Sequence, residues 1–241
     1  CRSEITFIDG NKGTLRYRGI DIEDLIGAPN GFSSTIYLLL KGVLPSDTEH
    51  KEFSQVLGAE YGVPTQVLNV IRAFPRDSHP MSVLIASFSA LAAHFHADQV
   101  DALTSTLIAI AKVPGIVASI YRHTANQEFI QSDANLEYTQ NFIKMMFGNA
   151  DAVHRDIMYK ALDAIFIMHA DHEQNASTAT VRMSGSSGAG LFACLCAGVA
   201  TLWGPAHGGA NEAVIKMLAD IGSPENVSSF IDKVKNNKDK G

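Results

Sequence analysis

Histidines and glycines gather in three segments of the chain whose residue types could support chemistry. The first covers residues 169–177 and reads His-Ala-Asp-His-Glu-Gln-Asn-Ala-Ser, directly after an apolar stretch typical of a helix. Residues three apart lie about one turn along a helix, so His169 and His172 are expected on one helix face. The pair could bind a substrate, form a structural hydrogen-bonded pair or hold a metal ion.

A metal ion is the weakest of these three interpretations. Zinc on a helix uses the pattern His-Glu-x-x-His, with the Glu between the two ligands, whereas Glu173 follows His172 here. No Cys or His elsewhere in the sequence stands out as a third ligand. We therefore expect no metal and favour substrate binding over a structural pair.

The second segment is the glycine-rich stretch of residues 185–190. It lacks the order Gly-x-Gly-x-x-Gly, follows no predicted strand and has no acidic partner downstream, so it is a poor dinucleotide-binding motif. A turn between two helices, in which the glycines permit close packing, is the better interpretation.

The third segment covers residues 203–212 and reads Trp-Gly-Pro-Ala-His-Gly-Gly-Ala-Asn-Glu. Pro205 fixes one backbone dihedral, while Gly208 and Gly209 permit a close approach of the backbone to other groups. A helix is expected to begin near Asn211, whose side chain can cap it. His207 therefore lies just ahead of a predicted helix N-terminus.

The position of His207 suggests a role for its imidazole. The partial positive charge at a helix N-terminus disfavours a second positive charge, so the ring is expected to stay neutral and to donate a hydrogen bond. That arrangement can polarise a carbonyl during enolisation. The alternative is a buried histidine that satisfies a turn, with the two glycines serving only as a helix entry.

The elements that must position these segments are mostly helical. A small β-hairpin is predicted first, over residues 5–18, because two alternating runs of β-branched and aromatic residues flank Asp9-Gly10 and Gly13. After the hairpin the hydrophobic period becomes that of helices. Residues 46–49 have the sequence of a capping box, which predicts the start of a helix that ends near Gly58.

The remaining helices are predicted from their hydrophobic period and boundary residues. Pro114 is expected to kink or break one of them, and Ser223-Pro224 supplies an N-cap and a first-turn proline for the last. No strands alternate with helices, so we expect a mainly α fold with a small β start. The predicted helices cover residues 33–40, 46–58, 65–74, 80–96, 99–124, 135–147, 152–174, 187–202, 211–221 and 225–236.

Composition and charge limit the classes of partner. The chain has 241 residues and a net charge of -6, and its only basic cluster lies within residues 233–240. Nucleic-acid binding needs clustered Lys and Arg, so no nucleic acid is expected as a partner. Three cysteines do not make a disulfide framework. Cys194 and Cys196 are expected to be buried free thiols, which fits a cytoplasmic location.

No membrane span or secretion signal is expected. The longest apolar run, residues 188–203, is shorter than the ~20 residues that a spanning helix needs and predicts a fully buried helix. No charged start followed by an apolar core and a cleavage site is present. The chain starts at Cys1 and closes no recognisable element at Gly241, so we expect it to be part of a longer protein.

With these segments in view, the sequence resembles the bacterial citrate synthases. The resemblance rests on residues 5–10, 15–19, 76–81, 169–177 and 202–212, which follow one another in the family's order. The last two segments are specific, and the others support them. Together they extend over nearly the whole chain.

The resemblance implies a mostly α-helical enzyme with a large helical domain and a smaller one that closes over the substrates. It implies condensation of acetyl-CoA with oxaloacetate and hydrolysis of citryl-CoA, a step of the tricarboxylic acid cycle, without a cofactor beyond the substrates. It also implies self-association as a homodimer or hexamer. The expected divisions are a hairpin region at 1–20, a partial large domain at 21–220 and the start of the small domain at 221–241.

The resemblance assigns roles to individual residues. His207 matches the family histidine that donates a hydrogen bond to the thioester carbonyl as the enol or enolate forms. His172 matches a histidine that binds oxaloacetate, and Ser177 resembles the residue that helps to orient the catalytic histidine. The expected supporting residues are His169, Asn175, Gly208 and Gly209.

Other parts of the family's machinery do not occur in this sequence. In the family, a second histidine in a Gly-Phe-Gly-His-Arg motif polarises the ketone of oxaloacetate, a downstream aspartate is the base, and arginines clamp the substrate carboxylates. That motif does not occur within residues 1–241, so these residues alone are expected to be inactive.

Two alternatives remain open at this point. A 2-methylcitrate synthase shares these motifs and uses propionyl-CoA in place of acetyl-CoA. A non-catalytic helical module could instead dimerise through the predicted helices at 80–96, 99–124 and 187–202.

Overall fold

A computed structural model describes residues 3–95, 101–148 and 152–236 of the chain. Its contacts define two compact units, Cys1–Ala200 and Thr201–Gly241. Of the predicted helices, residue 96 and residues 99–100 lie outside the described residues. The predicted domain boundaries after residues 20 and 220 stay predictions.

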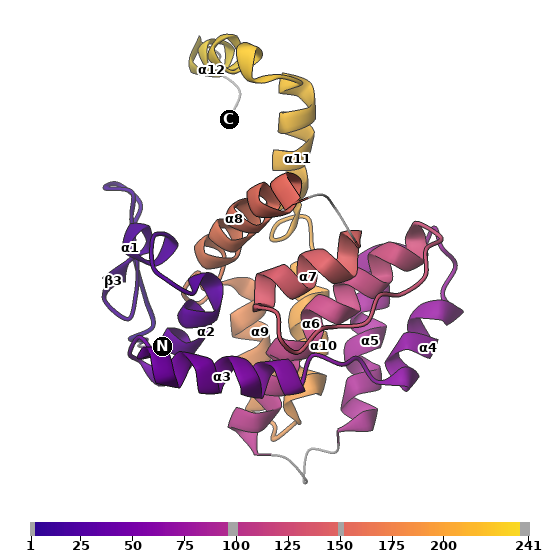
Figure 1. Cartoon of the computed structure of the whole chain (residues 1–241). Helices are drawn as coiled ribbons and strands as arrows, with labels where there is room; N and C mark the ends of the chain where they lie inside the picture. Colours follow the sequence, from indigo (N-terminus) through magenta and orange to yellow (C-terminus); the bar gives the residue numbers. More distant parts are fainter. Residues whose placement is uncertain (1–2, 96–100, 149–151, 237–241) are drawn as a thin grey trace. The chain divides into compact units, whose positions relative to one another are not determined.

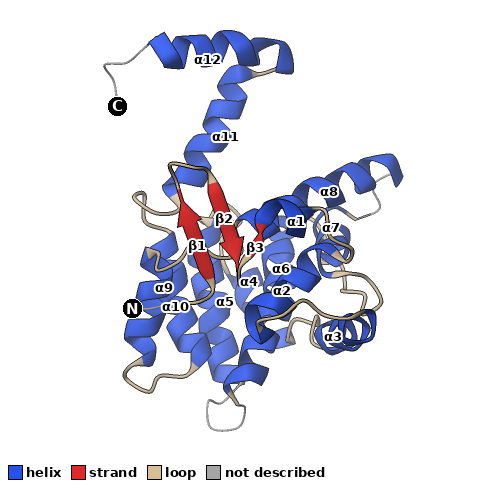
Figure 2. Cartoon of the chain, turned by 90° about the vertical axis from the view of Figure 1, so that its left-hand side faces the viewer, coloured by secondary structure: helices blue, strands red, loops and turns tan. Residues whose placement is uncertain are grey.

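The first unit begins with a small antiparallel sheet (Figure 2). Strand β1 (Thr6–Asp9) pairs with β2 (Thr14–Tyr17), and β2 pairs with β3 (Ile20–Asp21). The predicted hairpin is therefore confirmed, with Thr6 opposite Tyr17. The third strand was not predicted. It forms because Arg18 and Gly19 have positive φ angles of 52° and 87° and turn the chain back along β2.

Helices make up the rest of the first unit (Figure 1). Most predicted helices are confirmed, and the capping box is present, since Glu49 N donates to Ser46 Oγ and Ser46 N donates to Glu49 Oε2. The helices are α1 (Ile22–Ile26), α2 (Gly31–Lys41), α3 (Asp47–Ala59), α4 (Thr65–Ala73), α5 (Pro80–His94), α6 (Ala102–Thr124), α7 (Tyr138–Phe147), α8 (Ala152–Met168), α9 (Ala176–Gly185) and α10 (Leu191–Leu202).

The predicted helix at 152–174 is wrong in its last six residues, 169–174. Helix α8 ends at Met168, and a separate helix, α9, begins at Ala176. Glu173 has a φ of 56°, which an α-helix cannot contain, and Asn175 caps the new helix. The region between the helices is therefore a loop.

Helix α6 runs through Pro114 without a break, so the predicted break is absent. Proline has no N–H to donate to the carbonyl four residues earlier, which belongs to Ile110. The hydroxyl of Tyr138, from α7, donates to that Ile110 oxygen over 3.0 Å. The helix can therefore continue because another element satisfies the acceptor that Pro114 leaves free.

Helix α6 is also the main core element. Its buried residues Ile108, Ile116 and Ile120 belong to one apolar cluster with residues of α4, α5 and α10, and its Ala111 belongs to a second cluster with α2, α3 and α7. Its Lys112 is buried, and the ammonium donates to the backbone oxygens of Glu60 (2.8 Å) and Gly62 (3.0 Å) just after α3.

Helix α6 is long and apolar enough to cross a membrane, since the mean hydropathy of its most apolar 18-residue window is 1.7. The sequence analysis predicted a helix at 99–124 but did not consider it as a possible membrane span, because Lys112 and Pro114 interrupt its apolar run. Within the described chain, however, 61% of the apolar window is buried. A core helix of a globular protein meets the same criteria, so the composition of α6 does not by itself indicate a membrane.

Helix α10 is only partly buried, contrary to the prediction of a fully buried helix. Phe192, Cys194 and Gly198 are buried, whereas Leu202 is 37% exposed. Cys194 is buried as predicted and Cys196 is half-buried, and both are free thiols. Burial raises the pKa of the Cys196 thiol.

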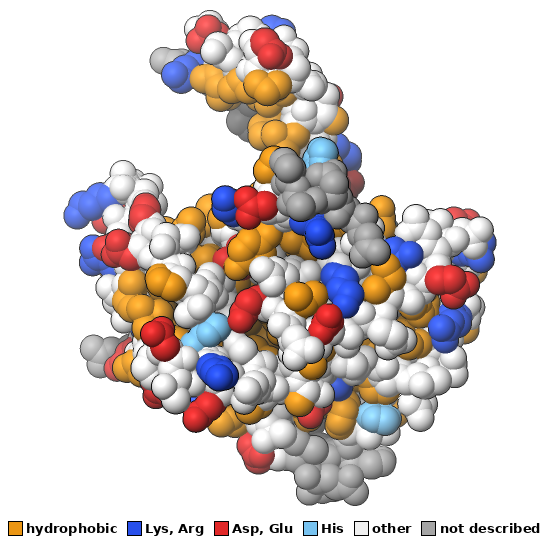
Figure 3. Space-filling view, in the orientation of Figure 1, with side chains coloured by type: hydrophobic (Ala, Val, Ile, Leu, Met, Phe, Trp, Pro, Cys, Tyr) orange, Lys and Arg blue, Asp and Glu red, His pale blue; other side chains and the backbone are white. Residues whose placement is uncertain are grey.

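The second unit contains α11 (Gly209–Ile221), a short 3₁₀ helix η2 (Pro224–Asn226) and α12 (Val227–Asn236). The predicted helix at 225–236 is thus a 3₁₀ turn followed by an α-helix. Ser223 precedes the 3₁₀ turn and makes no side-chain capping bond. On the face shown in Figure 3, Lys and Arg side chains are interspersed with Asp and Glu side chains.

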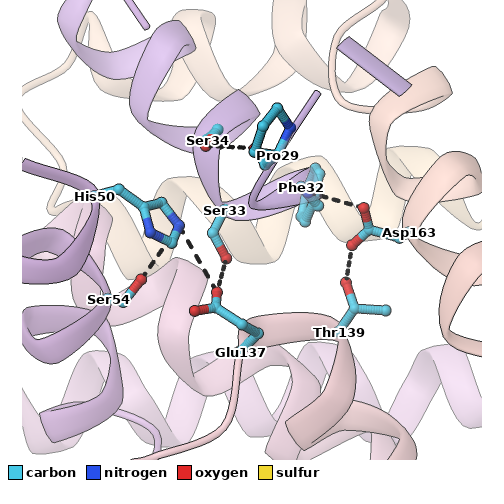
Figure 4. A network of polar contacts seen from close by, with 9 residues as sticks. All are labelled: Pro29, Phe32, Ser33, Ser34, His50, Ser54, Glu137, Thr139 and Asp163. Carbon is cyan, nitrogen blue, oxygen red and sulfur yellow. Dashed lines mark hydrogen bonds and ion pairs between the residues drawn. The ribbon is translucent and has the colours of Figure 1, made fainter. Parts of the chain in front are cut away.

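A polar network joins four helices of the first unit (Figure 4). The buried carboxylate of Asp163, on α8, accepts from the amide of Phe32 at the start of α2 (3.0 Å) and from Thr139 Oγ1 on α7 (2.6 Å). Beside it, Glu137 Oε2 accepts from Ser33 Oγ (2.9 Å) and lies 3.8 Å from His50 Nε2 on α3. Asp163 therefore caps α2 from a distant part of the chain.

Burial raises the pKa of Asp163, while the hydrogen bonds from Thr139 and Phe32 oppose that change. Because the folded-state pKa lies above the unfolded value, the wild type loses stability as pH rises through the window between them, starting near pH ~4. Asp163→Asn has no carboxylate to ionise there. The stability of Asp163→Asn relative to wild type is expected to increase with pH through this window, measured by urea unfolding at a series of pH values.

Asp163→Ala provides the matched comparison. Its stability should show the same pH dependence as that of Asp163→Asn. Its free energy of unfolding should be lower by a further ~1–3 kcal/mol at every pH, because the Phe32 amide and the Thr139 hydroxyl lose their acceptor. A stability difference between Asp163→Asn and wild type that does not change with pH would contradict the assignment.

Candidate functional site

The loop between α8 and α9 carries the first histidine segment. The backbone N–H of His169 donates to Ile165 O (3.0 Å), and its Nδ1 lies 2.9 Å from the same oxygen. His169 therefore ends α8 with a local hydrogen bond. Helix α8 does not extend to His172, so the predicted pairing of His169 and His172 on one helix face is wrong.

The side chain of His172 is exposed at the centre of this loop. Its two neighbours are both held by hydrogen bonds. Asp171 Oδ2 accepts from the hydroxyl of Thr6 on β1 and from the backbone N–H of Glu173 (3.0 Å). The imidazole of His172 thus projects from a backbone that is held on both sides.

Tyr17, on β2, meets the same loop from within the core. Its side chain is fully buried, and its hydroxyl donates to Ile167 O (2.8 Å) and lies 3.3 Å from the carbonyl oxygens of both Met168 and Asp171. Desolvation by burial raises the pKa of Tyr17, so its hydroxyl keeps its proton. The hairpin and the end of α8 are joined at this point.

Asn175 and Ser177 lie where the loop enters α9. Asn175 Oδ1 accepts from the N–H of Thr178 (2.9 Å) and caps the helix. Ser177 Oγ donates to Gly198 O on α10 (3.0 Å). A Cβ on Gly198 would lie only 2.6 Å from Val181 Cγ2, so the absence of a side chain there lets α9 and α10 approach closely.

The glycine-rich segment behaves as predicted. Helix α9 ends at Gly185 and α10 begins at Leu191, with Gly188 at a φ of 82° between them. The element directly before it is helix α9 and not a strand, so the predicted helix-to-helix turn is confirmed.

His207 lies in the second unit, in a tight turn between α10 and α11. The N–H of His207 donates to Gly204 O (3.0 Å), and the N–H of Gly208 donates to Leu202 O (3.0 Å). Helix α11 begins at Gly209 with Gly208 as its N-cap. The predicted position of His207 just ahead of a helix is confirmed, but Asn211 lies inside the first turn and is not the cap.

The two glycines after His207 differ in the space that is available for a side chain. A Cβ on Gly208 would lie 2.2 Å from Leu202 O, which is far too close, whereas a Cβ on Gly209 would first meet Pro205 Cβ at 3.7 Å, an ordinary contact. Gly208 is therefore required for the turn that places His207. Gly209 is compatible with a side chain.

The donor groups offer no evident metal site. Within residues 3–95, 101–148 and 152–236, no group of three or more His, Cys, Asp or Glu side chains is placed to hold a metal ion. His172 and Ser177 in the first unit and His207 in the second can supply hydrogen bonds.

Citrate synthases are among the known proteins that resemble this chain. The family model described as citrate synthase, C-terminal domain, matches residues 1–241. A citrate synthase from Thermotoga maritima MSB8 matches with a TM-score of 0.81 and 31% identity, over 100% of this chain and 63% of that one. One from Pyrobaculum aerophilum matches with a TM-score of 0.84 and 30% identity, over 96% and 60%.

A third solved structure is similar to the same extent. It is the ternary complex of carboxymethyl coenzyme A and oxaloacetate with citrate synthase from Thermoplasma acidophilum, with a TM-score of 0.84, 30% identity and coverage of 100% of this chain and 63% of that one. The mainly α fold with its small sheet is thus the citrate synthase fold. The chain belongs to the citrate synthase family and spans 60% to 63% of the length of these relatives.

Sequence reasoning missed three residues that hold the His172 loop: Thr6, Tyr17 and Asp171. Asp171 lies inside the predicted segment, but it was not singled out because its partners are far away in the sequence. Thr6 and Tyr17 belong to the hairpin segments that resemble the family, and that resemblance was the only sign of their importance.

Gly208→Ala is expected to destabilise the turn by ~1–3 kcal/mol, because the new methyl group must displace the backbone around Leu202. Trp203 is the only tryptophan in the chain, so its fluorescence reports on this turn directly. The measurement is the urea midpoint of the Trp203 signal.

Gly209→Ala is the matched control. It should leave the midpoint unchanged or raise it slightly, since Ala favours a helix over Gly by ~0.5–1 kcal/mol. Equal midpoints for the two variants would show that the close approach at Gly208 does not constrain the turn.

Proposed function

We propose that the protein to which residues 1–241 belong condenses acetyl-CoA with oxaloacetate and water to give citrate and CoA. The observation that carries the proposal is the turn at residues 203–208, in which a glycine-dependent contact sets His207 directly before the N-cap of α11. The Thermoplasma acidophilum relative, which binds oxaloacetate and a coenzyme A analogue, supports the choice of substrates.

In this reaction His207 acts on the thioester. Removal of a methyl proton from acetyl-CoA places negative charge on the thioester oxygen, and a hydrogen-bond donor at that oxygen lowers the barrier. The imidazole of His207 carries a ring N–H that can be this donor. The family's aspartate base and second histidine belong to segments that do not occur within residues 1–241.

His172 is the proposed oxaloacetate ligand of this chain. Oxaloacetate carries two carboxylates and a ketone, all of which accept hydrogen bonds, and the exposed imidazole of His172 can donate one. Ser177 and Asn175 are supporting residues at the start of α9, which Asn175 caps. His169, Gly208 and Gly209 complete the supporting set.

The remaining parts of the proposal concern context. The reaction needs no cofactor beyond its substrates. We propose that it is a step of the tricarboxylic acid cycle and that the protein is cytoplasmic. The protein self-associates as a homodimer or hexamer. Partly exposed apolar residues on α10, such as Leu202, are consistent with a contact to a further chain or segment.

Thiol release from acetyl-CoA in the presence of oxaloacetate tests the proposal in the full-length protein. His207→Ala is expected to lower kcat by ~10²–10³, the usual effect of losing one donor to a developing oxyanion. His172→Ala should mainly raise the KM for oxaloacetate. The assay measures both constants for each variant.

His154→Gln is the control, because His154 is an exposed histidine on α8 outside both histidine segments. It should keep wild-type constants. A full-length protein that releases no thiol would overturn the proposal and favour a non-catalytic helical module. Unchanged kinetics in His207→Ala would overturn the role of that residue.

The second candidate reaction is that of a 2-methylcitrate synthase. One additional methylene changes kcat/KM by about 10–200-fold in either direction, depending on the fit of the acyl pocket. We expect a higher kcat/KM with acetyl-CoA than with propionyl-CoA, measured with the same thiol assay. The reverse order would identify a 2-methylcitrate synthase.

A further inference from the structure

The hairpin at the start of the chain contacts the loop that carries His172. Thr6 on β1 and Tyr17 on β2 lie opposite each other in the sheet, and both reach Asp171. We propose that Thr6 and Tyr17 are positioning residues for His172 and act through Asp171. This inference rests on the proposed function, in which His172 binds oxaloacetate.

Tyr17 holds the backbone on the N-terminal side of His172. Its hydroxyl has one proton, which goes to the nearest acceptor, Ile167 O at 2.8 Å. The hydroxyl oxygen in turn accepts from the backbone N–H of Asp171 at 3.4 Å. A single buried hydroxyl thus links the last turn of α8 to the residue before His172.

Thr6 holds the other side of His172 through the carboxylate of Asp171. One carboxylate oxygen, Oδ2, accepts both the hydroxyl of Thr6 and the backbone N–H of Glu173. Glu173 has a φ of 56°, a conformation that costs a non-glycine residue free energy and persists only where the surroundings impose it. The bond to Asp171 is one such constraint.

These contacts determine where the imidazole of His172 can lie. With its backbone held on both sides, the side chain keeps only its two χ rotations, so little conformational entropy is lost when substrate binds. If the hairpin were only a structural element, loss of its hydroxyls would lower stability and leave substrate affinity unchanged. The two roles therefore predict different kinetics.

Steady-state kinetics of the full-length protein separates the two roles. Tyr17→Phe and Thr6→Val each remove a hydroxyl and keep the shape of the side chain. Both are expected to raise the KM for oxaloacetate by roughly tenfold, as for the loss of a group that orients a ligand-binding histidine, with less than about twofold change in the KM for acetyl-CoA. Thr6→Ser keeps the hydroxyl and should restore wild-type values.

Tyr138→Phe is the matched control for Tyr17→Phe. Tyr138 is also buried, and its hydroxyl also donates to a helix carbonyl, Ile110 O, at 3.0 Å. It should lower the melting temperature to a similar extent without a change in either KM. Hydrogen exchange at the Glu173 amide gives a second measurement, since it should speed up in Tyr17→Phe and Thr6→Val but not in Tyr138→Phe.

The possible outcomes are distinguishable. If the wild type releases thiol but Tyr17→Phe and Thr6→Val behave like Tyr138→Phe, the positioning role is overturned and the proposed function stands. If the wild type releases no thiol, the proposed function is overturned and the inference falls with it. A selective rise in the KM for oxaloacetate, together with faster exchange at Glu173, supports the inference.

Discussion

Helix ends and a helix proline leave backbone groups without intrahelical partners, and much of this structure depends on how distant side chains satisfy them. Asp163 caps α2, Lys112 binds the carbonyls that follow α3, and Tyr138 binds the Ile110 oxygen that Pro114 leaves free. Tyr17 does the same at the end of α8. Because an unsatisfied buried polar group costs ~1–3 kcal/mol, each of these four contacts helps to hold the helices together alongside apolar packing.

The same constraint governs the candidate site. His172 lies where α8 has ended and α9 has not begun, and His207 lies where α10 has ended and α11 has not begun. Side chains between helices are not covered by neighbouring helical turns, which makes them accessible for binding. Their positions are precise only because Asp171 and Gly208 hold the two segments in place.

The first unit thus combines a packed helical core with a small sheet that contacts the His172 loop. Helix α6 contributes to three of the apolar clusters and tolerates a buried lysine and a proline because its neighbours satisfy both. The sheet contributes to a separate apolar cluster with α1, α2 and α8, through Tyr17 and the partly buried Leu15 and Ile20. Through Tyr17 and Thr6 it also reaches the loop with the proposed oxaloacetate ligand, which gives the hairpin a role beyond the start of the fold.

Local signals in the sequence determined most helices, the hairpin, the capping box at Ser46 and the place of His207 before a helix, because each depends on residues close together in the chain. The family also followed from short segments. The end of α8, the role of Asp171, the cap of α2 and the continuity of α6 were decided by the tertiary structure. In each case the deciding partner, such as Tyr17 or Tyr138, is distant in sequence, and hydrogen bonds of that kind leave no periodic pattern to read.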